Sequence, residues 1–326
     1  MTDRIRASAP ARANLIGNPS DLYGGAVLGC SVPLRARVAL EPAPRLELVV
    51  GGSHRVVVGR DDLAPRGDAF DVARAVLADL DSLPAVRVSY DSEIPFGSGL
   101  AGSTALLVAL LRSLLAWSGT ELRDHALAER ARRIEQDLLG IACGWVDPYL
   151  CVFGGLHYVD CRDKRRGDCE PALVEGVPVP ADPLPFVLAF TGLSHHSGTV
   201  HAPIRDRWER GEPEVVEGYE RVTAIAHEAR RAFAGADWQA FGALMNENHA
   251  IQRGLGGSGQ ANERLIEAAL RAGARGAKLA GAGHGGTIVA LWPDADTEFL
   301  ERALRDAGAV ALYRPEPTPG VTLECL

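Results

Sequence analysis

The segment that decides the fold is "IPFGSGLAGSTALLVALL", residues 94–111. Its glycines Gly97, Gly99 and Gly102 fit the pattern G-x-G-x-x-G, and a long apolar run follows them. A strand is expected just before this loop, and a buried helix is expected over 102–117. Glycines at a helix N-terminus let an anion approach the free backbone N–H groups without meeting a Cβ atom. The stretch therefore predicts a phosphate-binding loop.

Two other phosphate-binding folds use similar glycine patterns. A Walker A loop requires Gly-Lys followed by Ser or Thr, and this sequence lacks that ending. A dinucleotide-binding fold requires an acidic residue about 20 positions further on, at the end of a second strand. Glu121 has about this spacing, but it opens another predicted helix. A nicotinamide-dependent oxidoreductase is therefore the less favoured alternative.

Size and composition narrow the class of protein. The chain has 326 residues, which is sufficient for two domains, and its net charge of −8 does not favour nucleic-acid binding. None of the six cysteines forms a C-x-x-C pair, so we expect reduced thiols in a cytoplasmic protein. The N-terminus has no apolar signal core and no stretch is apolar enough to span a bilayer, so no membrane partner is expected.

One stretch divides the chain into two parts. Residues 161–185 are rich in charge, proline and glycine, which is typical of a domain boundary. We expect an N-terminal domain over 1–165, a linker over 166–184 and a C-terminal domain over 185–326.

The remaining pattern predicts the elements of each domain. The first should contain a hairpin, an amphipathic helix and a short strand, at 46–59, 121–139 and 154–160. The second should begin with a strand at 186–192 and continue with helices near 199–210, 214–234, 237–252 and 259–272. Three more strands and one helix at 295–306 complete it. This order resembles a split β-α-β arrangement in an α+β sandwich.

A second glycine loop, "GAGHGG", spans Gly281 to Gly286. It also contains G-x-G-x-x-G, but the residues that follow it are typical of a strand. Alone it could be a tight turn. Together with the first loop it predicts a second wall around one bound nucleotide.

A third stretch, "APARANLIGNPSDLYGGAVL" at residues 9–28, completes a set of three motifs. Together they resemble the motifs of the GHMP kinases, the family of galactokinase, homoserine kinase, mevalonate kinase and phosphomevalonate kinase. The matching segments are Pro10–Gly17 with Asp21, Pro95–Ala105, and Lys278–Gly286, and their order agrees with the family along the whole chain. "YDSEIP" and "SGTVHAPIRDRWERG" most resemble glucuronokinase and related sugar-1-kinases.

This resemblance implies a two-domain GHMP kinase fold of the α+β class. The N-terminal domain should be a mixed α/β domain (ribosomal protein S5-like), and the C-terminal domain a ferredoxin-like α/β sandwich. The implied activity is that of an ATP-dependent kinase.

The family motifs also imply a nucleotide and magnesium site. The residues expected to bind ATP are Pro95, Gly97, Ser98, Gly99, Leu100, Ala101, Gly102, Ser103, Thr104, Gly281 and Gly283. Ser103 and Glu135 are the expected ligands of Mg²⁺, which prefers oxygen donors. From the residues alone, Glu135 could equally lie on a solvated helix face.

Two residues are expected to act in phosphoryl transfer. Asp147 matches the catalytic aspartate of the family, and it would accept the proton of the attacking hydroxyl. From the sequence alone, an aspartate before Pro148 could equally cap a helix. Arg12 occupies the basic position of the first motif, where it would keep Asp147 ionised and stabilise the transferred phosphoryl group.

The expected acceptor site includes Asp21, Asn18, Tyr23, Gly283 and Arg205. Asp21 matches the carboxylate that accepts sugar hydroxyls in galactokinase-like members. Asn18 and the proline after it replace the family's Glu-His pair, which argues against galactose itself. Arg205 could bind an anionic group of the acceptor, although a solvated helix face is the slightly favoured explanation.

The histidines of "LSHHSGTVH", His195, His196 and His201, lack the partners of a metal site, and we expect them in a loop that faces the substrate.

These expectations combine into one function. We expect a kinase that transfers the γ-phosphoryl group of Mg-ATP to a small polar metabolite, with the anomeric hydroxyl of a sugar or uronic acid as acceptor. A mevalonate-type kinase acting on a non-sugar alcohol, an ATP-using decarboxylase and a non-catalytic relative are the alternatives. The sequence does not determine the acceptor or the oligomeric state.

Overall fold

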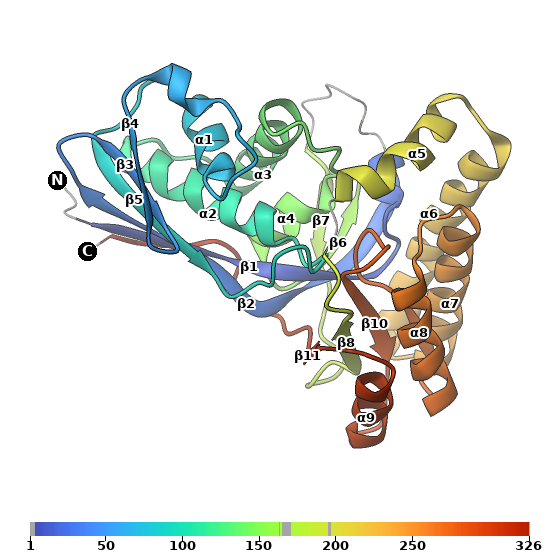
Figure 1. Ribbon diagram of the computed structural model, residues 1–326. Helices are drawn as coiled ribbons and strands as arrows, with labels where there is room; N and C mark the ends of the chain where they lie inside the picture. The colour runs from blue at the N-terminus through green and yellow to red at the C-terminus, as the bar shows by residue number, and fades with distance from the viewer. Residues whose placement is uncertain (1–3, 163, 165–170, 195–196, 326) are drawn as a thin grey trace.

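The computed structural model describes residues 4–162, 164, 171–194 and 197–325, and its strands form two sheets (Figure 1). The large sheet contains β1 (Ile5–Ile16), β2 (Ala26–Pro42), β3 (Leu46–Val50), β4 (Ser53–Val57), β5 (Val86–Ser92), β6 (Leu156–Asp160), β7 (Leu173–Gly176) and β12 (Thr322–Cys325). The small sheet contains β8 (Phe186–Phe190), β9 (Gly276–Leu279), β10 (Thr287–Leu291) and β11 (Ala311–Tyr313).

The helices fall into two groups along the chain. Those before the small sheet are α1 (Asp71–Ala78), α2 (Gly102–Trp117), α3 (Asp124–Arg133) and α4 (Val146–Phe153). Those after β8 are α5 (Ser197–Glu209), α6 (Pro213–Ala234), α7 (Trp238–Gly254), α8 (Gln260–Ala272) and α9 (Glu298–Asp306). Within the described residues, no helix has both the length and the apolar character that a bilayer span requires.

The large sheet bends along β2. The first part of this strand, Ala26–Cys30, pairs with β6, whereas Ala36–Pro42 pair with β5. The pairing of β1 with β2 shifts register between Pro10 and Ala11, as at a β-bulge, which turns a strand locally. Beyond this shift β1 reaches the small sheet, where the Asn14 N–H donates to the Ala280 carbonyl oxygen at 3.2 Å.

The small sheet has the strand order β11-β8-β10-β9, and every pair in it is antiparallel. In chain order it is β-α-β-β-α-β, with α5 to α8 in the first connection and α9 in the second. This topology is ferredoxin-like, so the expected fold class is confirmed for this part of the chain.

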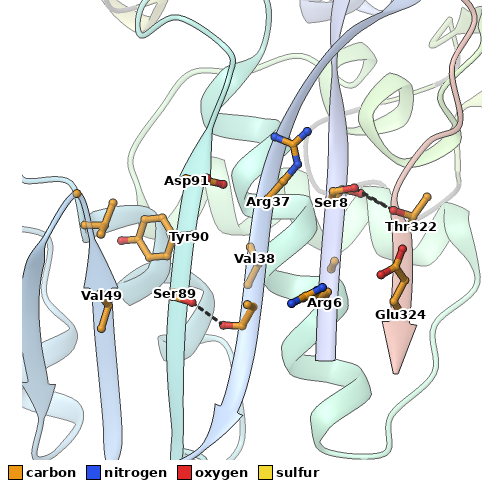
Figure 2. Close-up of a pocket in the computed structure, with 14 residues that line it drawn as sticks. Arg6, Ser8, Arg37, Val38, Val49, Ser89, Tyr90, Asp91, Thr322 and Glu324 are labelled. Carbon is orange, nitrogen blue, oxygen red and sulfur yellow. Dashed lines mark hydrogen bonds between the residues drawn. The ribbon is translucent and has the colours of Figure 1, made fainter. Parts of the chain in front are cut away.

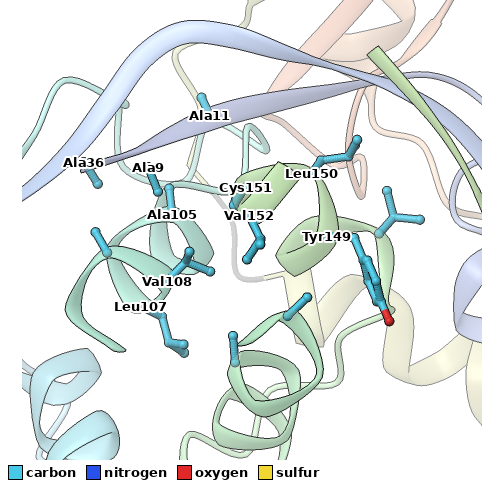
Figure 3. Packing of buried hydrophobic residues seen from close by; sticks show 14 of the residues in the cluster. Ala9, Ala11, Ala36, Ala105, Leu107, Val108, Tyr149, Leu150, Cys151 and Val152 are labelled. Carbon is cyan, nitrogen blue, oxygen red and sulfur yellow. The ribbon is translucent and has the colours of Figure 1, made fainter. Parts of the chain in front are cut away.

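Apolar packing fixes the helix that carries Asp147. The first glycine loop, at residues 97–102, leads into α2. The α2 residues Ala105, Leu107 and Val108 are fully buried (Figure 3). They pack with the small side chains of β1, such as Ala9 and Ala11, which let a helix approach the sheet closely. The α4 residues Leu150 and Cys151 belong to the same core.

The end of the chain returns to the large sheet. Ser31 Oγ donates to the Glu316 carbonyl oxygen at 2.8 Å and accepts from the Thr318 N–H at 2.8 Å. The strand β12 then pairs antiparallel with β1, with Arg6 opposite Glu324. Thr322–Cys325 therefore lie in the first sheet, although the expected C-terminal domain runs over 185–326. The strand β7 likewise lies within the predicted linker 166–184. The domain limits remain a prediction.

Most of the expected elements are present. The hairpin at 46–59 forms β3 and β4, and the helix over 102–117 has the predicted bounds. The expected helix over 121–139 is shorter, and it continues as a π-helical turn over Ile134–Leu138. In the described part of the chain, five cysteines are free thiols, while Cys169 lies outside the described residues.

Candidate active site

The two glycine loops touch each other. A Cβ atom on Gly281 would lie 2.6 Å from the carbonyl oxygen of Gly99. This distance is a steric clash, so the close approach requires glycine at position 281. Thr287 Oγ1 also donates to the Ser98 carbonyl oxygen at 2.8 Å. The strand β1 binds to the first loop through the Arg12 N–H, which donates to the Leu100 carbonyl oxygen at 3.1 Å. The two loops therefore form one continuous wall.

The first loop has the properties of an anion cradle. Gly97 and Gly99 have φ values of 65° and 71°, and Ala101 is also left-handed, just before α2 begins at Gly102. The Ser98 hydroxyl is buried and has no partner among the described residues. The backbone N–H groups at the start of α2 and this hydroxyl can donate to phosphate oxygens.

Arg12 and Asp147 form the central ion pair. Arg12 Nε donates to Asp147 Oδ1 at 2.6 Å, and Arg12 Nη2 donates to Asp147 Oδ2 at 2.5 Å. Arg12 Nη1 donates to the Gly99 carbonyl oxygen at 2.7 Å. Burial acts to lower the pKa of Arg12, but Asp147 outweighs this effect and the pKa is raised. The geometry thus joins the expected base to the phosphate loop through one guanidinium group.

Asp21 lies close to this pair. It belongs to a 3₁₀ turn over Ser20–Tyr23, its side chain is 6 % exposed, and Oδ2 accepts from the Val146 N–H at 3.2 Å. Burial, followed by the negative charge of Asp147, raises the pKa of Asp21 to about 6. Gly144 packs directly against the Asp21 carboxylate. The structure therefore brings two carboxylates from distant parts of the sequence to one site.

Glu135 adds a third carboxylate from the π-helical turn. It is buried, and Thr104 Oγ1 donates to its Oε1 at 2.9 Å. Burial, followed by the charge of Asp147, raises the pKa of Glu135 to about 7. Ser103 is exposed in the first turn of α2, next to Thr104. π-Helical turns occur often at functional sites, and the sequence alone did not signal this one.

These residues fit a magnesium ion that is bound mainly by a nucleotide. In the part of the chain that the structure describes, no three His, Cys, Asp or Glu side chains form a ready metal cluster. Mg²⁺ in kinases typically uses one or two carboxylates together with substrate phosphates. The buried carboxylate of Glu135, which accepts a hydrogen bond from Thr104 near the start of α2, has the chemistry of such a ligand.

The other residues expected to bind the acceptor, Tyr23, Arg205 and Gly283, each contact a different neighbour. The Tyr23 ring stacks on Tyr219 with 4.1 Å between ring centroids, and burial raises the pKa of Tyr23 to about 12. Arg205 Nε donates to Glu209 Oε1 at 3.0 Å, so its charge is partly balanced within α5. Gly283 packs against the Gly257 carbonyl oxygen. His201 is buried within α5 and not in the expected loop, while His195 and His196 lie outside the described residues.

Asn18 differs most from its expected role. Its side chain is engaged with Lys278, Leu279 and Gly281 of the second glycine motif. Lys278 was not expected to be a site residue, although it begins the third motif. In the sequence, Lys278 stands out only because it is charged and its neighbours in the expected strand are apolar.

A separate cavity of about 540 Å³ lies over the large sheet, away from these residues (Figure 2). Its lining includes Arg6, Ser8, Arg37 and Glu324, and Ser8 hydrogen-bonds Thr322 across β1 and β12. None of the carboxylates of the candidate site lines it.

The two glycine loops lie in segments that match two models of one protein family. The profile of the GHMP kinases N terminal domain matches residues 68–155, and that of the GHMP kinases C terminal domain matches residues 228–310. The chain belongs to the GHMP kinase family. It is an ATP-dependent phosphotransferase with an alcohol group as acceptor. A galactokinase galactose-binding signature also matches this GHMP kinase, over residues 2–42.

Similar proteins span the whole GHMP kinase chain. A mevalonate kinase of Thermococcus sibiricus is 28 % identical in an alignment of 343 positions, gaps included, that covers 98 % of each chain. Glucuronokinase 1 of Arabidopsis thaliana is 28 % identical in an alignment of 336 positions, gaps included, that covers 94 % of this chain and 91 % of that protein. A crystal structure of Lactococcus lactis galactokinase complexed with galactose has a TM-score of 0.82 at 19 % identity, and covers 98 % of this chain and 95 % of its own.

Proposed function

We propose that this kinase phosphorylates a hydroxyl of a sugar or a uronic acid, and that the anomeric hydroxyl is its acceptor. The observation that carries this proposal is the buried carboxylate of Asp21 beside the Arg12–Asp147 pair. Asp21 lies within the segment that matches the galactose-binding signature. A buried carboxylate with free lone pairs suits a ligand that donates several hydroxyl hydrogen bonds.

The proposed reaction assigns one task to each side chain. Asp147 accepts the proton of the attacking hydroxyl, because each of its oxygens retains a lone pair beyond its bond to Arg12. The acceptor oxygen bonds to the γ-phosphorus while the bond to the bridging oxygen breaks, and ADP leaves. Arg12 balances the charge on the transferred group, and the 97–104 loop holds the phosphates.

Glu135 and Ser103 are the proposed protein ligands of Mg²⁺, with Thr104 orienting Glu135. When bound, the ion would neutralise charge on the β- and γ-phosphates. Support comes from the buried position of Glu135 and its short distance to the Thr104 hydroxyl. A cytoplasmic location also remains a prediction from the sequence.

Mevalonate is the second candidate acceptor. Several archaeal mevalonate kinases match almost the whole chain at 28–29 % identity, as the plant glucuronokinase does at 28 %. Mevalonate and glucuronate share a carboxylate. Arg205, whose charge acts on Tyr23, is the proposed partner for such an anionic group. A neutral sugar would not need this contact.

The test is ADP release from Mg-ATP with a panel of acceptors: glucuronate, galacturonate, galactose, glucose, mevalonate and homoserine. We expect turnover with a sugar or uronic acid, and a product whose phosphorus couples to the anomeric proton in NMR spectra. Turnover with mevalonate alone would overturn the sugar proposal and support the second candidate. A parallel assay for CO₂ release would identify a decarboxylase.

A further inference from the structure

Both ends of the Asn18 side-chain amide are engaged by residues of the second glycine motif. Its Nδ2 donates to the Gly281 carbonyl oxygen at 3.1 Å and lies 3.4 Å from that of Leu279, and its Oδ1 accepts from Lys278 Nζ. The side chain is buried. Asn18 therefore connects the segment over residues 17–25, here called the acceptor loop, to the second glycine loop.

Lys278 has unusual surroundings for a lysine. Its side chain is 1 % exposed, and it makes no ion pair with a carboxylate in the described parts of the chain. Besides Asn18, the one acceptor of its ammonium group among the described residues is the Leu279 carbonyl oxygen, at 2.5 Å. Burial, with a further effect of the Arg12 charge, lowers the pKa of Lys278 to about 7. A buried lysine without a carboxylate partner is costly to keep in a core position, so the two contacts that it makes call for a functional explanation.

A second buried side chain, from a different element, holds the same point of the acceptor loop. Asn248, on α7, accepts from the Gly17 N–H through Oδ1 at 2.9 Å, and its Nδ2 donates to the Asn18 carbonyl oxygen at 3.3 Å. It is fully buried. The backbone and the side chain of the Gly17–Asn18 segment are thus both fixed by residues of the C-terminal part of the chain.

We propose that Lys278 and Asn248 are positioning residues for the acceptor. They hold Gly17 and Asn18, and through them the turn that carries Asp21, at a fixed distance from the second glycine loop. The proposal rests on the proposed role of Asp21 as the acceptor carboxylate. Since the same contacts reach Leu279 and Gly281, the acceptor loop and the nucleotide wall are held together as one unit.

The chain offers a matched control on the same helix and strand. Asn246, two positions before Asn248 on α7, accepts from the Ala277 N–H at 3.0 Å and donates to the Arg275 carbonyl oxygen at 3.2 Å. It binds the other end of β9, and within the described residues its side chain has no hydrogen bond to the acceptor loop. The variants are therefore Lys278→Met and Asn248→Ala, with Asn246→Ala as control.

The first measurement is hydrogen exchange of the amides over residues 17–25 in the full-length protein, which requires no knowledge of the acceptor. Lys278→Met and Asn248→Ala should each speed this exchange by roughly tenfold, the scale of one lost buried hydrogen bond. Asn246→Ala should leave it unchanged. Equal exchange in all three variants would overturn the proposal.

The second measurement separates positioning from general loosening of the fold. With an acceptor that the wild-type enzyme turns over, KM for the acceptor should rise roughly tenfold in both test variants, while KM for ATP changes far less. An equal rise in both KM values, or the same rise in Asn246→Ala, would overturn the proposal. If Lys278→Met does not fold, the Asn248 and Asn246 pair decides the outcome alone. Faster exchange with unchanged acceptor KM would instead refute the role of Asp21 in the proposed function.

Discussion

Replacing Gly144 with alanine should disable the acceptor site without touching the nucleotide site. A Cβ atom at this position would lie 1.8 Å from Asp21 Oδ2 and 2.6 Å from Asp21 Cγ. Because Cβ atoms do not approach other heavy atoms within 3.0 Å, the carboxylate or the loop must move by more than about 1 Å. That movement would also break the bond from the Val146 N–H.

A misplacement of about 1 Å can lower turnover by about 10²-fold, and this is the expected loss in kcat/KM for the acceptor. The assay is ADP release at saturating Mg-ATP, accompanied by direct titration of a nucleotide. Nucleotide affinity should stay within about twofold, because Gly144 lies outside both glycine loops. Gly254→Ala is the control, since a Cβ atom there meets nothing within 4 Å. Normal acceptor kinetics in Gly144→Ala would refute the placement of Asp21 in the acceptor site.

Four further changes test the other parts of the site. Asp147→Asn should lower turnover by at least ~10² and leave nucleotide binding intact, and near-normal turnover would remove Asp147 from the role of base. The pKa of Asp21, about 6, means that this carboxyl is protonated below that pH and ionised above it. The KM for the acceptor should therefore fall as the pH rises from 5 to 7, and Asp21→Asn should abolish this trend. Gly99→Val should weaken ATP binding, because the φ of +71° at this position disfavours a branched side chain and a Cβ atom there would point at the second glycine loop. Unchanged ATP affinity in a titration would contradict this. Arg205→Ala should raise KM for an acidic acceptor more than for a neutral one, and equal effects in the ADP assay would leave Arg205 as a surface residue.

Local pattern was sufficient to predict much of the fold. The hairpin at 46–59 and the helix over 102–117 depend on neighbouring residues, namely a glycine turn between β-branched runs and an apolar run after a glycine loop. The family resemblance predicted a sheet in each of the two domains, and its three motifs indicated which residues form the site. The ion pair between Arg12 and Asp147 was also expected, because the resemblance assigned roles to both residues.

The sequence could not show what depends on long-range geometry. Asn18 was expected to contact substrate, but its amide is engaged by a strand that lies far along the chain. The importance of Gly144 becomes visible only when Asp21 is placed against it. The π-helical turn that presents Glu135 differs from an α-helix by one extra residue, which no periodicity over so short a stretch can reveal.

The position of β12 beside β1 has a consequence for synthesis of the protein. Ribosomes deliver β1 first, yet its partner at that edge is complete only when Cys325 has emerged. Until then the edge of β1 presents unpaired N–H and C=O groups, which can pair with another chain. The first and last strands lie side by side (Figure 1), so a circular permutant that joins them through a short linker and opens elsewhere would close this edge early.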